Sequence, residues 1–217
     1  MKLTLNPFPR SDLLLQVALS LARLLAQSAF NVTSVIRKPE QAPAIIALSA
    51  APHVLSLEEA PVSALTALFT ETRAQLVYFS AGAGGKGGPE RTRAVDYEGA
   101  VKVFDAVEAV QGEKPRVILV SAVDTRNPDT LETFPAHYNE ADKESSRRAH
   151  RALETYYKWK YEADKNLVAR TAFRWTILRP GELIDGPGMG RVEIGRTHLT
   201  SAIPVRWLPP GAVDHHF

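Results

Sequence analysis

Short runs rich in β-branched residues alternate with helical patterns along most of the chain, and this alternation constrains the fold more than any other feature. The runs are residues 31–36, 53–57, 76–80, 116–121 and 175–178. Several are apolar without strict alternation, which is typical of strands that helices cover on both faces, so we expect the sheet to be parallel. Strand–helix alternation through about residue 179 predicts a single doubly wound, mainly parallel α/β domain.

Helical patterns fill the intervals between these runs. Ser11 and Asp12 can cap a helix that extends to about residue 28, Pro39 can open another, and residues 58–71 form a third. A fourth helix is expected from apolar residues at helical spacing, followed by a stop at Gly112; these residues are Ala100, Val103, Phe104, Val107 and Val110.

The composition excludes several classes of protein. With 217 residues, 26 Lys and Arg against 24 Asp and Glu, and 45% apolar residues, the chain is large enough to bury a core. The absence of Cys excludes disulfides, thiolate nucleophiles, Cys zinc sites and iron–sulfur clusters. The weak, spread positive charge gives no support for nucleic-acid or membrane binding, and the histidines show no metal-ligand spacing. Without a signal peptide or a run of about 18 apolar residues, we expect a cytoplasmic protein that binds a small molecule.

Two regions depart from the strand–helix pattern. Residues 124–150 are mostly polar, include two Pro, and separate a strand from the next helix. A long insertion of this kind is either a lid over a site or a mobile loop. The pattern also fades after Gly190, and residues 201–217 hold three Pro and no periodic segment, which is typical of a terminal tail.

A tyrosine and a lysine lie on the apolar stripe of the helix expected after this insertion. The stripe consists of Ala149, Leu153, Tyr156, Lys160, Ala163 and Leu167. One interpretation is a Tyr-x-x-x-Lys pair, in which the ammonium favours the ionised phenol and makes Tyr156 a proton donor and acceptor near neutral pH. The other is an amphipathic lysine whose stem packs while its head reaches water. Tyr161 and Lys165 repeat the spacing on a different helix face.

Several segments that follow predicted strands are candidates for ligand contact, because the carboxyl ends of parallel strands line the ligand crevice of an open sheet. Ser121 can bind a substrate carbonyl, or it can end its strand by bonding its own backbone. SAGAGGKGGPER, residues 80–91, either lets a ligand approach its glycines or is a flexible loop. Arg37 and Lys38 suit a phosphate or form a solvated pair. RPGEL, residues 179–183, borders the same edge or is a turn.

Taken together, these motifs resemble a known family. In chain order they are SAGAGGKG, VDYEGAVKVFDAVEA, RVILVSA, YYKWKYEAD, TILRPGEL and GPGMG. Their order and approximate spacing resemble those of the atypical short-chain dehydrogenase/reductase group, in particular its single-domain NAD(P)-binding proteins allied to NmrA-like and biliverdin/flavin-reductase-like members. The resemblance covers roughly residues 28–200 and implies a Rossmann-type fold.

The resemblance also implies a reaction, a cofactor and a set of site residues. The reaction is hydride transfer from NADPH to a carbonyl-like or flavin-like acceptor, with NADP(H) favoured over NAD(H). Tyr156 protonates the acceptor, Ser121 orients it, and Lys160 holds the cofactor ribose and lowers the pKa of Tyr156. This pair is preferred over Tyr161 and Lys165. The other implied cofactor-binding residues are Arg37 at the adenosine phosphate, Ser80, Ala81 and Gly82 along the dinucleotide, and Pro180, Gly181, Glu182 and Leu183 beside the nicotinamide.

The first third of the chain departs from the family pattern, because all 13 Gly lie at position 82 or later. Family members begin with a strand that runs into G-x-x-G-x-x-G, whereas QVALSLA, residues 16–22, stands where those glycines belong. Residues 1–27 and 201–217 are therefore the atypical parts of a predicted domain spanning 1–217. Two alternatives follow: a non-catalytic protein that senses the dinucleotide or binds a protein partner, and a cofactor-defective product of an altered coding sequence.

Overall fold

The computed structural model of the protein describes residues 13–84, 87–184, 186, 194 and 203–204. The cap expected at Ser11 and Asp12, most of the GPGMG motif and the tail after residue 204 lie outside the described residues. Within the described ranges, no helix is long and apolar enough to cross a membrane.

The described helices and strands follow each other in nearly the predicted order. The α-helices are α1 (Leu13–Gln27), α2 (Ala42–Ile46), α3 (Val62–Glu71), α4 (Gly88–Thr92), α5 (Gly99–Ala109), α6 (Glu140–Ala152) and α7 (Glu154–Val168). The strands are β1 (Thr33–Ile36), β2 (Ala51–Val54), β3 (Leu76–Phe79), β4 (Arg116–Val120), β5 (Trp175–Leu178), β6 (Leu183–Ile184) and β7 (Ile203–Pro204). Two 3₁₀ turns, η1 (Pro39–Gln41) and η3 (Pro128–Thr130), and a π-helical turn, η2 (Arg93–Glu98), complete the order.

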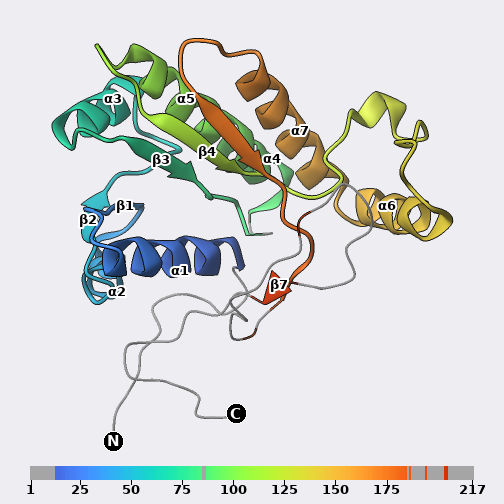
Figure 1. Ribbon diagram of the computed structural model, residues 1–217, viewed down its shortest axis with the longest axis horizontal. Helices are drawn as coiled ribbons and strands as arrows, with labels where there is room; N and C mark the ends of the chain where they lie inside the picture. Colours follow the sequence, from blue (N-terminus) through green and yellow to red (C-terminus); the bar gives the residue numbers. More distant parts are fainter. Residues whose placement is uncertain (1–12, 85–86, 185, 187–193, 195–202, 205–217) are drawn as a thin grey trace, which may run out of the picture.

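All of the described strand pairs are parallel. β1 pairs with β2, β4 lies between β3 and β5, and β6 pairs with β7. Helices connect the neighbouring parallel strands, as a βαβ chain requires: α2 lies between β1 and β2, α5 between β3 and β4, and α7 between β4 and β5. The predicted parallel α/β class is confirmed. Over the described residues, however, β1–β2 and β3–β5 form separate sheets rather than one continuous sheet (Figure 1).

The larger hydrophobic core lies between the three-stranded sheet and the helices α3, α5 and α7 (Figure 1). Burial alternates along β3 and β4, so that one face of the sheet is fully buried and the other is half-buried. This corrects the expectation that both faces are equally covered. The buried strand residues are Val77, Phe79, Val117 and Leu119, and they pack with Phe104, Val107, Ala163 and Leu167 from the helices.

A second, smaller cluster holds the N-terminal part together. Leu19 and Ala22 of α1 pack with Ile36 of β1 and with Ile45 from α2. Figure 1 shows this part, with α1 and α2, at the opposite end of the molecule from α6. The two clusters therefore support different ends of the site described below.

The stretch that the sequence analysis treats as one helix is two helices. α6 ends at Ala152 and α7 begins at Glu154, because Leu153 has φ −130° and ψ 36° and leaves the helical region. Leu153 is exposed rather than buried, so the predicted apolar stripe begins at Tyr156.

The predicted lid or loop at 124–150 is also corrected, since residues 140–150 belong to α6. Asn139 caps this helix, accepting a hydrogen bond from the Asp142 N–H at 2.9 Å, while the Asp142 carboxylate accepts from the Asn139 N–H at 3.0 Å. The third predicted helix is shorter than expected: it begins at Val62 after Pro61, and residues 56–60 form a turn.

Candidate functional site

The carboxyl ends of β3, β4 and β5 meet at one edge of the three-stranded sheet. Because these strands are parallel, the residues that follow them, Ser80, Ser121 and Arg179, emerge at the same edge. Backbone pairing continues past the ends of β4 and β5: the Ser121 N–H donates to Leu178 O at 2.7 Å, and the Val123 N–H donates to Pro180 O at 2.9 Å. The structure thus brings the predicted Ser121 and Pro180 segments side by side.

Helix α7 brings Lys160 to this edge. The Lys160 side chain is fully buried, and its Nζ donates to Val120 O, the last carbonyl of β4, at 3.3 Å. The same Nζ lies 5.5 Å from the centre of the Tyr156 ring, one helical turn away. Tyr156 and Lys160 are therefore together at the end of β4, as the Tyr-x-x-x-Lys interpretation requires, while their catalytic roles stay predictions.

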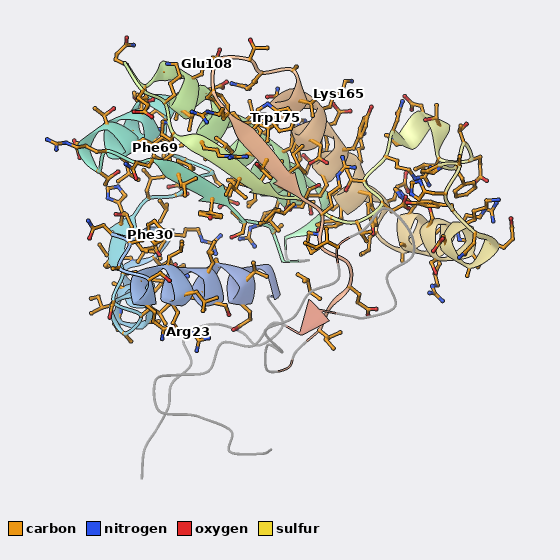
Figure 2. The ribbon with its side chains drawn as sticks, viewed as in Figure 1. Arg23, Phe30, Phe69, Glu108, Lys165 and Trp175 are labelled. Atoms are coloured by element: carbon orange, nitrogen blue, oxygen red, sulfur yellow. The ribbon has the colours of Figure 1, made fainter. Side chains whose placement is uncertain are left out.

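The competing pair lies elsewhere on α7. Lys165 Nζ is 5.9 Å from the ring of Tyr161, but 64% of the Lys165 side chain is exposed on the outer side of the helix (Figure 2). Lys165 is therefore an amphipathic lysine whose ammonium reaches water, which is the alternative interpretation of the Tyr-x-x-x-Lys spacing. The geometry favours Tyr156 and Lys160 over the repeated pair.

Sequence reasoning missed Asp96, which the structure places against Lys160. Asp96 belongs to the π-helical turn η2 and is 1% exposed. Its Oδ1 lies 3.2 Å from Lys160 Nζ, and its Oδ2 accepts a hydrogen bond from the Ala83 N–H at 2.9 Å. A signal was present, because Asp96 precedes Ala100 and Val103 on the apolar stripe of the following helix, where a carboxylate needs a partner.

The environment reverses the expected effect on Tyr156. Burial raises the pKa of Tyr156 well above its usual range, and the negative charge of Asp96, together with Tyr157 and Asp164, raises it further. The net direction is therefore opposite to the lowered pKa that the resemblance implies, mainly because of burial, while the effect of Lys160 itself stays a prediction. The Tyr156 phenol is protonated at neutral pH, as an unperturbed phenol also is, and its raised pKa makes it a weaker acid.

Ser121 lies at the predicted place but is almost fully enclosed by protein groups. It is 1% exposed, and its hydroxyl is 3.4 Å from the hydroxyl of Thr125. Nearby, Asp164 accepts two hydrogen bonds from Arg179, at 2.8 and 3.1 Å. Burial raises the pKa of Asp164, while the Ser121 hydroxyl and the Arg179 guanidinium oppose that rise. Ser121 thus belongs to a buried polar group with Asp164, and its contact with a substrate stays a prediction.

At the other end of the edge, a carboxylate joins two arginines. Arg37 follows β1 and its Nη1 lies 3.4 Å from Glu58 Oε2, while Arg91 Nε of α4 lies 3.3 Å from Glu58 Oε1. Lys102 donates to the carbonyls of Leu57 and Glu58 at 3.0 and 2.9 Å, which holds the turn that carries Glu58. Arg37 is half exposed, so its charge is accessible at the position expected for an adenosine phosphate.

The remaining predicted contacts are short side chains or glycines near this edge. Ser80, Ala81 and Gly82 are half-buried after β3, and Ala83 is buried. Gly87 has φ +82°, and a Cβ there would lie 2.5 Å from Arg91 Cδ, so the turn into α4 requires glycine. Pro180, Gly181 and Leu183 are half-buried and Glu182 is exposed, and nothing lies within 4 Å of a Cβ built on Gly181.

The start of the insertion is fixed next to this site. Asp124 Oδ1 accepts from Arg126 Nε at 2.6 Å and from the Tyr138 hydroxyl at 2.7 Å, and Arg126 also donates to the Ser146 hydroxyl of α6 at 2.7 Å. His150 Nε2 is 3.2 Å from Asp124 Oδ2, and its ring stacks on Tyr157 with centroids 4.2 Å apart. These contacts tie α6 to the end of β4.

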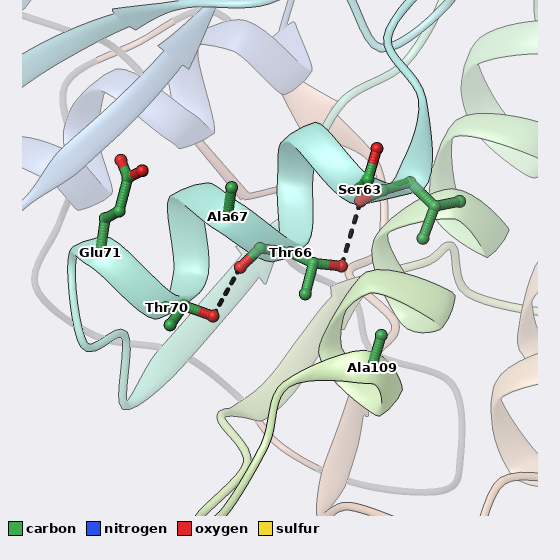
Figure 3. A pocket seen from close by; sticks show the side chains of 7 residues that line it. Ser63, Thr66, Ala67, Thr70, Glu71 and Ala109 are labelled. Atoms are coloured by element: carbon green, nitrogen blue, oxygen red, sulfur yellow. Dashed lines mark hydrogen bonds between the residues drawn. The ribbon is translucent and has the colours of Figure 1, made fainter.

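A shallow cavity of about 600 Å³ lies away from these residues, between α3 and the end of α5 (Figure 3). Thr66 donates to Val62 O at 3.1 Å and Thr70 donates to Thr66 O at 2.8 Å, so both hydroxyls are used within α3. In the described part of the chain, no group of three or more His, Asp or Glu residues could hold a metal ion. The carboxyl edge of the sheet is therefore the better candidate for chemistry.

Comparison with known proteins identifies the family of the chain. A family model described as NAD(P)H-binding matches residues 16–203. The chain belongs to this NAD(P)H-binding family. The expected nicotinamide-dinucleotide-binding protein of the atypical short-chain dehydrogenase/reductase type is thereby confirmed.

Two relatives match most of the chain. A UPF0659 protein of Schizosaccharomyces pombe is 42% identical over 185 residues, which are 85% of this chain and 73% of the relative. A Bacillus subtilis protein named as an uncharacterized sugar epimerase, YhfK, is 32% identical over 166 residues, 76% of this chain and 66% of the relative.

Solved structures show the same fold. A Bacillus halodurans protein assigned as an NAD-dependent epimerase/dehydratase has a TM-score of 0.67 at 26% identity, covering 87% of this chain and 77% of that one. The anaerobillin reductase ChuY of Escherichia coli has a TM-score of 0.62 at 20% identity, covering 87% of this chain and 79% of that one. The second likeness concerns the fold alone.

Proposed function

We propose that the protein is an NADPH-dependent oxidoreductase that reduces a small carbonyl-like or flavin-like acceptor. The observation that carries the proposal is the fully buried Lys160, held at the end of β4 one helical turn from the Tyr156 phenol. A buried ammonium is costly unless it is paired, as Lys160 is with Asp96, and parallel sheets bind ligands at this edge. The names of the relatives, which include a reductase and an NAD-dependent epimerase/dehydratase, agree with this chemistry.

The residues present fit a nicotinamide dinucleotide along the edge. Ser80, Ala81 and Gly82 carry little side chain, which leaves their backbone open to a dinucleotide. Lys160 has three N–H groups, of which one bonds Val120 O and another faces Asp96 Oδ1, so one donor is left for a ribose hydroxyl once a movement of the surrounding groups uncovers it. When bound, the nicotinamide supplies hydride. Pro180 and Leu183 offer apolar contact at its end of the crevice.

The chain's own residues supply the proton and the orientation. Tyr156 holds a proton at neutral pH, as any phenol does, and gives it to an oxygen or nitrogen on which negative charge develops. Burial and nearby carboxylates raise the pKa of this phenol and so weaken it as an acid, which the developing negative charge of the acceptor must offset. Ser121 orients the acceptor from the adjacent strand end, after a small movement frees its hydroxyl from Thr125 and Asp164.

The charge near β1 supports NADPH over NADH. Arg37 and Arg91 bring two positive charges to the carboxylate of Glu58, and Lys38 follows Arg37 in the sequence. An excess of cations at the end of this strand suits a 2′-phosphate, whereas an acidic residue there would favour a free ribose hydroxyl.

Calorimetric titration with NADPH and NADH tests the cofactor assignment. We expect saturable binding of NADPH, tighter than that of NADH, and a loss of roughly 10-fold or more for NADPH in Arg37→Ala, since a charged phosphate contact is removed. Arg174→Ala, which changes an exposed arginine just before β5, is the matched control and should bind NADPH normally. Equal binding of both dinucleotides by the wild type and Arg37→Ala would reject the NADPH preference.

Turnover of Tyr156→Phe tests the catalytic assignment. The variant should bind NADPH but lose at least about 100-fold in turnover with carbonyl, quinone and flavin acceptors, because its phenol proton is missing. Tyr161→Phe removes a hydroxyl from the repeated pair and should retain activity. Unchanged turnover in Tyr156→Phe would contradict the role of Tyr156.

A non-catalytic, dinucleotide-sensing protein is the second candidate, and the enclosure of Ser121 favours it. A hydroxyl that is 1% exposed and close to Thr125 does not meet a substrate without rearrangement. This candidate predicts NADPH binding with little turnover of any acceptor, and a protein complex that responds to the dinucleotide. Robust NADPH oxidation by the isolated protein would exclude it.

A further inference from the structure

One buried carboxylate joins the three segments from which the site is built. Asp96 lies on η2, accepts the Ala83 N–H of the glycine-rich segment and pairs with Lys160 of α7. Lys160 in turn donates to the last carbonyl of β4. Water cannot replace these contacts, because Asp96 is 1% exposed and Lys160 is 0% exposed.

The position of Asp96 depends on an unusual local backbone. Residues 93–98 form a π-helical turn between α4 and α5, and such turns re-aim side chains relative to a regular helix. The turn is packed firmly, with Tyr97 stacked on Trp159 of α7 at 5.5 Å between ring centres. The aromatic stack and the Asp96–Lys160 ion pair thus connect η2 to α7 in the same region.

The charge balance gives this carboxylate a specific effect. A fully buried ammonium without a partner pays a large desolvation penalty, and Asp96 is the carboxylate in direct contact with it. The paired charges also change what Tyr156 experiences, because an isolated ammonium would favour the ionised phenol and an ion pair does not.

We propose that Asp96 is a positioning residue that couples the dinucleotide-binding backbone at Ala83 to the proton donor Tyr156 through Lys160. This inference rests on the proposed function and adds a positioning residue to the site. Asp96 need not contact substrate or cofactor: it holds the ammonium against β4, holds the glycine-rich segment against η2, and raises the pH at which the Tyr156 phenol ionises.

The groups that act on the Tyr156 phenol come from two packed elements. Asp96 faces it from η2, and Tyr157, Lys160 and Asp164 face it from α7 itself. Beyond them, Arg179 pairs with Asp164, and His150 stacks on Tyr157. Removal of the Asp96 charge beside the Lys160 ammonium lowers the pKa of Tyr156, because the repulsion between Asp96 and the phenolate disappears.

The test follows the Tyr156 phenol by NMR in the protein without added dinucleotide, with ¹³C-labelled tyrosine and Tyr156→Phe for assignment. In Asp96→Asn the titration of Tyr156 should begin about one pH unit or more below that of the wild type. Asp105→Asn is the matched control. It removes a carboxylate of α5 that pairs with Arg170, and it should leave the titration of Tyr156 unchanged. The same Tyr156 titration in Asp96→Asn and wild type overturns the proposal.

A second readout addresses the glycine-rich segment. Hydrogen exchange at the Ala83 amide should be about tenfold faster or more in Asp96→Ala, since its acceptor is lost. Asp105→Ala should leave that exchange rate unchanged. An Ala83 amide that exchanges at the wild-type rate in Asp96→Ala contradicts the link to η2.

A double variant covers the case in which single variants fail to fold. Asp96→Asn combined with Lys160→Met removes both charges at once, and well-packed neutral replacements of a buried ion pair are generally tolerated. Tyr156 should then titrate at a lower pH in the double variant than in Lys160→Met alone. Equal titration in the two would overturn the proposal.

These outcomes are independent of the proposed function. If the wild-type protein binds no NADPH and turns over no acceptor, the proposed oxidoreductase function is rejected. The NMR and hydrogen-exchange results test the role of Asp96 separately. In an active enzyme the alkaline limb of the pH–rate profile should move to lower pH in Asp96→Asn, which a purely structural loss of folded protein would not produce.

Discussion

The consecutive helices α6 and α7 are nearly the same length, but different forces hold them in place. α7 buries Ala163 and Leu167 in the large core, together with the Lys160 and Asp164 charges. The side chains that α6 buries are polar: Asp142, Ser146 and His150. α7 is therefore held mainly by apolar packing, and α6 mainly by hydrogen bonds to Asn139, Asp124 and Arg126.

The difference explains why α7 is visible in the sequence and α6 is not. Apolar residues at helical spacing are the main signal of a helix, and α6 has polar residues in the positions where that signal would appear. It also separates two tasks. α7 presents Tyr156 and Lys160 from a rigid core, whereas α6 is a locally supported element that can loosen without disturbing that core.

The largest expected effect concerns the apolar anchor of α7. Leu167→Ala empties a fully buried position and should lower the free energy of unfolding by about 2–5 kcal/mol. Chemical denaturation followed by circular dichroism should show one transition at lower denaturant. Leu153→Ala, at the exposed break between the helices, is the control and should change stability by less than about 1 kcal/mol. Equal losses in the two variants would show that α7 is not held by its core face.

The polar anchor of α6 should be weaker and its loss more local. Arg126→Met removes the bonds to Asp124 and the Ser146 hydroxyl, and should cost about 1.5–3 kcal/mol. Limited proteolysis should cut first between residues 124 and 152, while the α7 core keeps its protection. Arg148→Met changes an exposed arginine of α6 and should behave like the wild type. Global unfolding of Arg126→Met without local cleavage would refute the distinction between the two helices.

The cap of α6 offers a smaller, graded test. Asn139→Ala removes the side chain that accepts from the Asp142 N–H and should cost about 1 kcal/mol, with faster amide exchange confined to the first turn of α6. Asn139→Ser retains a capping oxygen and should recover most of the loss. No difference between Ala and Ser at this position would mean that the cap contributes nothing measurable.

The smallest expected effect distinguishes the two helices by pH. Burial alone raises the pKa of Asp124, but the Ser146 and Tyr138 hydroxyls and the Arg126 guanidinium outweigh it and lower this pKa below its usual range. Asp124 therefore contributes stability that is full above the unfolded value of about 3.9 and is lost as the pH falls through the lower folded pKa.

Asp164 of α7 has the opposite sign, since burial raises its pKa. Its ionisation disfavours the folded state above the raised pKa, and this contribution disappears as the pH falls below the unfolded value. Between about pH 5 and 3, Asp124→Asn should flatten the loss of stability and Asp164→Asn should steepen it, as measured by urea unfolding at each pH. Parallel curves for both variants would exclude the assigned signs.

The strands and the position of Lys160 could be predicted because they rest on local patterns. The run at 175–178 matches β5 residue for residue, and the run at 116–121 exceeds β4 by one residue. Lys160 stood out as a charge on an apolar stripe, and it is buried. Apolar burial and helical spacing depend on residues that are close together in the chain, so they can be predicted from a single sequence.

The parts that could not be predicted depend on distant partners. Asp96 and Lys160 are 64 positions apart in the sequence, and only the fold brings their charges together. The direction of the shift in the Tyr156 pKa follows from burial and from the charge of Asp96, so it could not be read from the Tyr-x-x-x-Lys spacing. The break at Leu153 was missed for a similar reason, because an exposed leucine at helical spacing is indistinguishable from a buried one.

At Arg37 and Arg91, a bound phosphate has to compete with the carboxylate of Glu58. Arg37 and Arg91 already share one carboxylate, so an incoming phosphate competes with an internal anion rather than entering an empty cationic pocket. The free energy gained when the phosphate replaces Glu58 then depends on the second negative charge of the phosphate. Added salt screens this interaction, because the charged groups are partly exposed. A dinucleotide with only a ribose hydroxyl has no charge with which to compete. For the proposed preference for NADPH, we therefore expect discrimination between the two dinucleotides to be greatest in dilute buffer and to narrow as ionic strength rises.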